Sequence, residues 1–367
     1  MSRPDQGRQI HRRDAVPAPP TRHGVPAAAR RRAHRLVRDG GLNTRTAMRL
    51  TYLKLGASAF FWGGSAIAGK LVMDELGPAS TTFLRFGGAA VLLLAIVPLM
   101  RLPLRVGLRE HLRYATLGLI GVTLCYYFYF RGLQASSAFN AALLEATIPL
   151  VTLALGVAAG RERASRLETV GFVVSYLGVV VIITRLSPNA ILEADYNWGD
   201  ILLLLSTVCF GLYNFLLKLF APRGDATVQT CLIFCYGALG LVPWLLLDQE
   251  GLADLRRFPE LEWSLIGCMV FMAVGSSVLA YLFFNQGVHL LGAAKASGFI
   301  NLVPVITIVL SLALLGERPG AIQLLGAAVV MVGVYLSQRR ARPGPAPAEV
   351  SRAAAGAGRG AWPRRRG

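Results

Sequence analysis

The chain has 367 residues, 54% of them hydrophobic, and a mean hydropathy of +0.50, which exceeds what the surface of a soluble protein tolerates. The net charge of +18 is concentrated at the ends, because residues 1–50 hold twelve Arg and three Asp while residues 338–367 hold eight Arg and one Glu. The region between is close to neutral. Composition therefore predicts a membrane protein with two basic tails, and we expect no nucleic-acid partner.

The first tail, residues 1–51, is rich in Arg, Pro, Ala and Gly and has no apolar period, which predicts a disordered cytoplasmic segment. No apolar stretch precedes Leu50, so the sequence predicts no cleavable secretory signal. An Arg-rich, acid-poor leader also fits an organelle transit peptide, and Met48 offers an alternative start of translation. Residues 338–367 predict a second disordered cytoplasmic tail.

Ten apolar stretches follow, each close to the roughly 20 residues that a helix needs to cross a bilayer. We therefore expect an all-α integral membrane protein with ten transmembrane helices. Their approximate limits are 53–73, 79–99, 113–131, 138–159, 168–185, 199–218, 227–247, 263–286, 295–315 and 320–337.

Basic residues in the loops predict the orientation, since cytoplasmic loops carry the excess of Lys and Arg. With the N-terminus inside, the inner loops hold ten basic residues and the outer loops five, and both tails also lie inside. We expect a multi-pass protein of the plasma or inner membrane with both termini in the cytoplasm.

The second half of the chain repeats the first. At a spacing of 155 residues, Tyr126 matches Tyr281, Pro149 matches Pro304, and further pairs are Gly132 with Gly287, Glu162 with Glu317, Gly171 with Gly326 and Gly178 with Gly333. At a spacing of 148, Gly63 matches Gly211 and Lys70 matches Lys218. This is an internal duplication, with one repeat at 52–185, an outer linker at 186–197 and the second repeat at 198–337.

Five spans per repeat is an odd number, so the second copy enters the membrane from the opposite side. Two inverted five-helix repeats that enclose a site near the membrane midplane are typical of secondary transporters. The duplication therefore predicts alternating access.

Several motifs in register resemble the paired EamA domains of the drug/metabolite transporter superfamily over residues 52–337. They are Phe61-Trp62-Gly63 followed by Lys70, Pro78 with Arg85, Pro149 followed by Glu162, and Asn301-Leu-Val-Pro304 followed by Leu315-Gly316-Glu317. The resemblance implies a ten-helix carrier, often an exporter of amino acids, nucleobases or other small metabolites. In this chain Phe210 stands at the repeat position of Trp62, and Arg85 has no basic counterpart.

Glu145 and Arg85 are the two charged candidates within the spans. Glu145 lies one turn before Pro149, and an acid at this depth usually faces a cavity or a partner. It either contacts a substrate amine or carries a coupling proton, and the alternative is an ion pair with Arg85 or Arg131. Arg85 either binds a substrate carboxylate or phosphate, or neutralises Glu145. If both face one cavity, a zwitterion satisfies both.

Charged residues near the ends of the spans have simpler interpretations. Lys70 and Lys218 are expected to extend to the lipid headgroups on opposite faces. Glu162 and Glu317 are expected to stabilise the N-termini of the helices that follow them.

Pro149 and Pro304 are expected to interrupt the helical hydrogen bonds where the backbone lines a cavity, and a kink that only fits helix packing is the alternative. Trp62, Tyr126, Tyr281 and Asn301 are the polar and aromatic residues expected to line it, and an interfacial aromatic position is the alternative for Tyr126.

The sequence thus predicts a secondary transporter that exports small metabolites or drugs, with proton coupling through Glu145 as one option. The expected partners are a small-molecule substrate and membrane lipids, and the pattern leaves the oligomeric state open. No cofactor, metal or enzymatic activity is expected, since the five cysteines lack the spacing of a zinc site and no Walker or nucleophile-elbow motif occurs. A lipid enzyme and a scaffold with lipid- or nucleic-acid-binding tails are the alternatives.

Overall fold

The structure, a computed structural model, describes residues 44–162, 164–186, 197–220, 224–247, 249–291, 296 and 299–338. Most of the expected tails and of the linker at 186–197 lies outside these ranges. Contacts divide the chain into two units, residues 1–48 and 49–367. Only the first turn of one helix is described in the smaller unit, and the fold below is that of the larger one.

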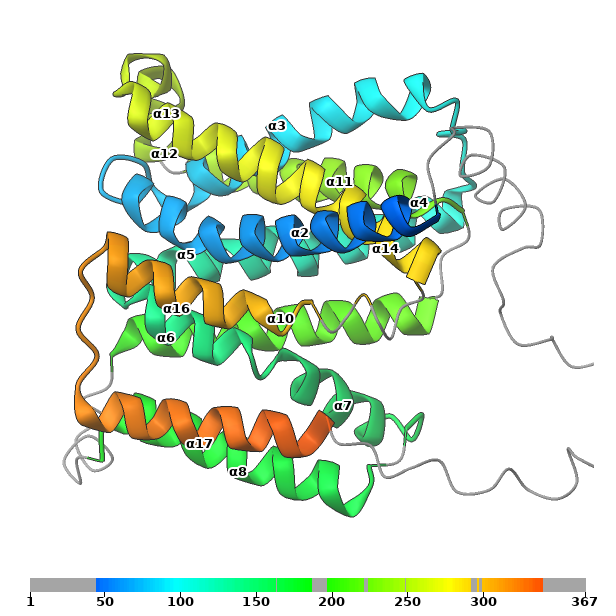
Figure 1. Ribbon diagram of the computed structural model, residues 1–367. Helices are drawn as coiled ribbons and strands as arrows, with labels where there is room; N and C mark the ends of the chain where they lie inside the picture. Colours follow the sequence, from blue (N-terminus) through cyan, green and yellow to red (C-terminus); the bar gives the residue numbers. More distant parts are fainter. Residues whose placement is uncertain are drawn as a thin grey trace, which may run out of the picture. The chain divides into compact units, whose positions relative to one another are not determined.

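All regular structure in the described residues is helical (Figure 1). The first repeat comprises α2 (Thr44–Val72), α3 (Pro78–Leu99), α4 (Leu108–Gly118), η1 (Leu119–Leu124), α5 (Cys125–Ala135), α6 (Ala138–Glu145), α7 (Ile148–Ala158) and α8 (Arg166–Thr184). The second comprises α10 (Trp198–Phe220), α11 (Ala226–Leu247), α12 (Gln249–Arg257), η2 (Phe258–Glu260), α13 (Trp263–Val270), η3 (Phe271–Leu279), α14 (Ala280–Leu291), α16 (Leu302–Leu314) and α17 (Ala321–Gln338).

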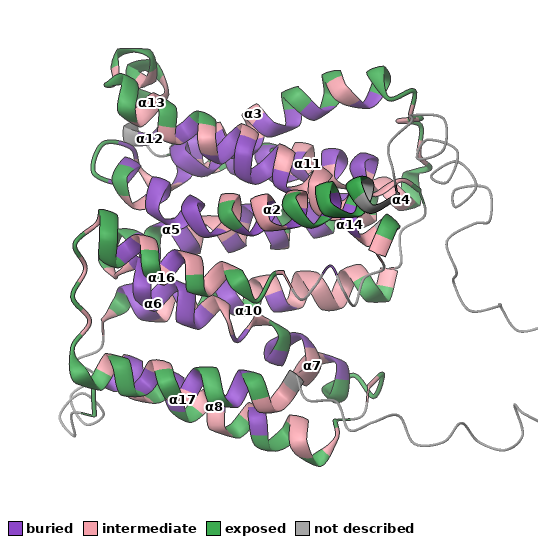
Figure 2. Cartoon of the chain, in the orientation of Figure 1, coloured by how far each residue is buried: buried purple, intermediate pink, exposed green. Residues whose placement is uncertain are grey.

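Six helical segments of the described residues are long and apolar enough to cross a membrane, and two shorter apolar helices accompany them. Their apolar residues are not confined to the core. On α8, Val170, Val173, Leu177 and Val180 are all at least half exposed and repeat every three to four residues, and Figure 2 shows exposed positions along α8 and α17. An exposed apolar stripe of this kind suits contact with hydrocarbon rather than water.

The last helices of the two repeats, α8 and α17, pack against each other through glycines. A Cβ atom on Gly171 would lie 2.6 Å from the carbonyl oxygen of Gly333, and one on Gly178 would lie 2.9 Å from that of Gly326. Early residues of α8 thus contact late residues of α17, so the two helices are antiparallel. Small residues allow this close approach of backbones, and the glycines concerned are the ones that the repeat pairs.

Each repeat also contains a π-helical segment at the same position. Segment η1 spans 119–124, and η3 spans 271–279. Adding the repeat spacing of 155 to the residues of η1 gives 274–279, which lies inside η3. Such segments widen a helix locally and are frequent at functional sites.

The turn between α5 and α6, residues 133–140, is held by charged side chains from other elements; we call it the α5–α6 corner. Lys70 Nζ donates to the carbonyl oxygens of Leu133, at 2.6 Å, and of Ser136, at the end of α5. The Glu317 carboxylate accepts from the backbone N–H groups of Ala138, at 2.8 Å, and Phe139, at 2.9 Å. A cation thus stabilises the carbonyl end of α5 and an anion the N–H end of α6, as the helix dipoles favour.

Candidate functional site

The fourth span is broken at the position of the candidate acid. Helix α6 ends at Glu145, α7 begins at Ile148, and Pro149 occupies the first turn of α7. In the second repeat α16 begins at Leu302, after a turn at 299–301, and Pro304 likewise lies in the first turn. Backbone irregularity at membrane depth is tolerated where protein or a cavity surrounds it. The break leaves Glu145 at the end of a helix rather than along its side.

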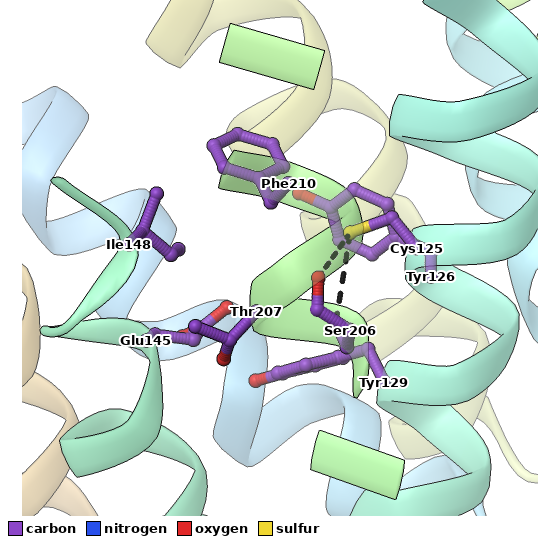
Figure 3. A pocket seen from close by; sticks show the side chains of 8 residues that line it. All are labelled: Cys125, Tyr126, Tyr129, Glu145, Ile148, Ser206, Thr207 and Phe210. Carbon is purple, nitrogen blue, oxygen red and sulfur yellow. Dashed lines mark hydrogen bonds between the residues drawn. The ribbon is translucent and has the colours of Figure 1, made fainter. Parts of the chain in front are cut away.

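A pocket opens beside this break, between α5, the α6–α7 segment and α10 (Figure 3). Its lining residues are Cys125, Tyr126, Tyr129, Glu145, Ile148, Ser206, Thr207 and Phe210. Helices α5 and α10 pack closely next to it, and the Cys125 Sγ contacts the Ser206 Oγ at 3.5 Å. The pocket is therefore formed by both repeats, since α10 belongs to the second.

Glu145 is the charged residue among the eight that line this pocket. Figure 3 shows its carboxylate directed toward Thr207 and the Tyr129 hydroxyl. Within the described part of the chain, no group donates a hydrogen bond to this carboxylate and no cation lies within ion-pairing distance. A direct ion pair of Glu145 with Arg85 or Arg131 is therefore not formed among the described residues: Arg131 bonds to the Gln134 amide, whereas the charge of Arg85 still acts on the Glu145 carboxylate from beyond contact distance.

Arg85 is 3% exposed and is held by neutral groups. Its Nε donates to Ser277 Oγ at 3.0 Å and its Nη2 to Ser276 Oγ at 2.9 Å. The guanidinium lies 4.8 Å from the ring centre of Tyr126 and 4.9 Å from that of Phe86, which is within cation–π range. Arg85 is not among the pocket-lining residues, although Tyr126, on which it rests, is one of them.

The other expected cavity residues separate into two groups. Trp62 Nε1 donates to the Ser276 carbonyl at 3.1 Å, and the indole lies 5.4 Å from the Tyr281 ring, so both residues belong to the cluster around Arg85. Asn301 lies elsewhere, exposed, directly before α16. Of the residues expected from sequence to form the site, Glu145 and Tyr126 line the pocket itself, and so does Phe210, the repeat counterpart of Trp62.

Three expectations for charged residues near helix ends, those for Lys70, Glu317 and Glu162, need correction. Lys70 binds carbonyl groups of the α5–α6 corner instead of extending to headgroups, because the end of α5 offers it unpaired acceptors. Glu317 stabilises α6 rather than the helix that follows it. Helix α8 is capped by Ser165 and Glu168, not by Glu162, and Glu162 instead pairs with Lys218 at 3.4 Å.

Sequence reasoning did not assign the two serines that hold Arg85, nor Cys125, Tyr129, Ser206 and Thr207 of the pocket. Ser276 and Ser277 are fully buried within η3. From the sequence alone, two adjacent small hydroxyl residues in an apolar span indicate a helix-packing surface. The position of the two serines in the repeat could have indicated their role, because the span that contains them is the repeat counterpart of the span that contains Tyr126.

The sequence profile of the EamA-like transporter family matches residues 50–184 and matches again at 197–338. This chain belongs to that family. The EamA-like domains thus cover most of the chain in two copies, which is the two-repeat membrane fold that the duplication indicates.

Named relatives are also transporters. The chain is 31% identical to the uncharacterized transporter YyaM of Bacillus subtilis over 284 residues, which cover 77% of this chain and 92% of the relative. It is 25% identical to a probable terminal-alkyne amino-acid exporter of Streptantibioticus cattleyicolor over 201 residues, covering 55% of this chain and 64% of that one. A solved crystal structure that is 18% identical shares the fold, with a TM-score of 0.51 over 80% of this chain and 99% of that one. This EamA-like protein is therefore a multi-pass membrane protein similar to transporters.

Proposed function

We propose that this chain is a secondary transporter of the cell membrane that exports a small polar or amphipathic metabolite through the Glu145 pocket. In this proposal ten helices form two inverted five-helix repeats, both termini are cytoplasmic, and the pocket opens to one face at a time. Amino acids and related compounds are the first solutes to test, because one relative is named as an amino-acid exporter.

The proposal is based on the surroundings of the Glu145 side chain. The Glu145 carboxylate lies in a pocket that residues of both repeats line, at a broken helix, and forms no hydrogen bond or direct ion pair within the described residues. A carboxylate at membrane depth without a partner is costly, and such residues usually mark a substrate or proton path. A broken helix at a repeat interface is also where secondary transporters bind their substrates. Glu145 is therefore our candidate for binding a substrate or a coupling proton.

The direct test compares metabolites inside and outside cells that express the wild-type chain, Glu145→Gln, or neither. We expect at least one metabolite to accumulate outside with the wild type, and this difference to disappear with Glu145→Gln at equal protein level. Glu260→Gln, an exposed site, is the matched control and should behave as wild type. Export that is unchanged in Glu145→Gln would contradict the assigned role of the pocket.

Reconstitution distinguishes a carrier from a scaffold. A carrier in liposomes gives saturable counterflow of the metabolite so identified, and removal of residues 1–43 and 339–367 should leave that counterflow intact. A proton-coupled carrier additionally responds to an imposed pH gradient. A flux that is linear in concentration and does not depend on counter-substrate would contradict the proposal.

A further inference from the structure

We infer that the α5–α6 corner is the gate of the Glu145 pocket on one face of the membrane, and that contacts from the second repeat hold this gate shut. We call this face the Lys70 face, because α2 ends there and Lys70 binds the corner. In the proposed orientation it is the outer face. The inference rests on the proposed function and concerns the regulation of the same site.

Three elements that line the pocket lead directly to the corner. Helix α5 carries Tyr129 in the pocket and ends at the corner, and α6 begins at the corner and ends at Glu145. Helix α10 carries Ser206 in the pocket and Asp200 at the corner. Each element covers the distance in about two helical turns, ~10 Å. The shortest path from the Lys70 face to the pocket therefore runs between these three elements.

Four leucines fill the space along this path, and we call them the leucine plug. They lie between the corner and the pocket in sequence, belong to one hydrophobic cluster and are at most 2% exposed: Leu133 of α5, Leu143 and Leu144 of α6, and Leu203 of α10. The backbones are equally close, since a Cβ atom on Gly199 of α10 would lie 2.7 Å from the carbonyl carbon of Ala135. Access from this face thus requires α5 and α6 to separate from α10.

Glu317, in the turn between α16 and α17, holds the first turn of α6. Its two carboxylate oxygens accept from the backbone N–H groups of Ala138, at 2.8 Å, and Phe139, at 2.9 Å. These N–H groups have no partner within their own helix, and hydrogen bonds to an ionised acceptor are about twice as strong as neutral ones. Glu317 belongs to the second repeat and α6 to the first. Movement of one repeat relative to the other at this face therefore breaks the contact.

Asp200 makes a second contact between the repeats, and this contact is incomplete. Its Oδ1 accepts from the Ser136 hydroxyl and, at 3.0 Å, from the Asn140 amide. The side chain is fully buried, and its Oδ2 has no hydrogen-bond partner within the described residues. A buried acceptor without a partner is unfavourable, and water reaches Oδ2 once the corner separates from α10. Such a contact suits an arrangement that has to open rather than a permanent one.

Sided labelling of Cys125 tests the gate without a known substrate. Cys125 lines the pocket and is 3% exposed, so a membrane-impermeant thiol reagent reaches it only when the pocket opens. The reagent is applied to intact cells and to inverted vesicles that contain full-length chains whose other cysteines are replaced by Ala. A separate chain with Pro319→Cys, in the same turn as Glu317, identifies the preparation that exposes the Lys70 face.

We expect Glu317→Gln to raise the labelling of Cys125 from the Lys70 face by about tenfold, equivalent to about 1.4 kcal/mol. The reason is that charge-assisted contacts with α6 become weaker neutral ones, which shifts the population toward the open gate. Glu317→Ala removes both acceptors and should raise the labelling further. Labelling from the opposite face should not rise in either variant. Glu260→Gln, at an exposed site, is the control and should be labelled as wild type.

Leu203→Cys, in a chain without native cysteines, places a second reporter in the leucine plug. Its labelling from the Lys70 face should rise together with that of Cys125 when Glu317 is changed. Cys125 labelling that rises while Leu203→Cys stays protected would contradict a path through the plug.

Unchanged labelling in both Glu317 variants, or a rise from the opposite face, would overturn the gate. An equal rise from both faces indicates unfolding and also counts against it. Counterflow measured on the same variants tests the proposed function separately: labelling as expected without counterflow of any solute would contradict transport and leave the gate standing.

Discussion

Arg85, which is buried, and Glu145, which is partly buried, are stabilised in different ways. Arg85 has two hydroxyl partners and two aromatic faces, so its guanidinium is hydrogen-bonded and packed within the fold. The Glu145 carboxylate faces a pocket and lacks such partners among the described residues. At the scale of single residues, Arg85 therefore has a structural role, whereas the Glu145 carboxylate remains available to bind a substrate or a proton.

The structural role of Arg85 predicts the effect of Arg85→Lys. An ammonium cannot reproduce the planar fork that reaches Ser276 and Ser277, so we expect the free energy of unfolding in detergent to fall by about 1–3 kcal/mol. Counterflow per folded molecule should stay near that of wild type. Arg256→Lys, at an exposed arginine, is the matched control.

Loss of counterflow in Arg85→Lys with unchanged unfolding would contradict this assignment. It would indicate that Arg85 contacts the substrate, which is the alternative that the sequence also allowed.

The sequence predicts which residue types matter in this region better than it predicts their partners. Glu145 and Arg85 stand out because charges are rare in apolar spans, and Trp62, Tyr126 and Tyr281 because the motifs or the repeat single them out. The partners of Arg85 lie 191 and 192 residues away, and no local pattern encodes such a contact. Lys70 and Glu317 were misassigned for the same reason, since the turn that they hold belongs to other helices.

At the scale of elements, the contact of α8 with α17 is the clearest expression of the repeat. Gly171 and Gly178 of α8 meet Gly333 and Gly326 of α17, and each glycine of one helix has its repeat counterpart in the other. The pairing was visible in the sequence as matched glycines, but their mutual contact was not, because the repeat spacing does not say which elements touch.

This contact predicts that Gly171→Ala destabilises the protein. The added Cβ would lie 2.5 Å from the backbone nitrogen of Ser337, and a backbone atom cannot move aside without separating the helices. We expect a loss of about 1–3 kcal/mol in the free energy of unfolding. Gly267→Ala is the control, because a Cβ there meets nothing within 4 Å and the change should be neutral or stabilising by up to about 1 kcal/mol.

Chemical denaturation of both variants in the same detergent measures the difference. Equal unfolding free energies for Gly171→Ala and Gly267→Ala would contradict the close packing of α8 on α17.

At the scale of the whole molecule, the account depends on two halves that cross the membrane in opposite directions. The antiparallel α8 and α17, the equivalent π-helical segments and the two family matches all agree with that arrangement. In the proposed mechanism, a pocket lined by both halves opens to either face as the halves exchange conformations.

The most direct measurement is the membrane sidedness of two equivalent turns, at Ala164 before α8 and at Pro319 before α17, which the repeat spacing of 155 relates. Ala164→Cys and Pro319→Cys are labelled separately in intact cells with an impermeant maleimide, in a background without native cysteines. We predict that Pro319→Cys reacts from outside, whereas Ala164→Cys reacts only after the membrane is permeabilised. Reaction of both cysteines from the same side would contradict the inverted repeat and, with it, the proposed transport mechanism.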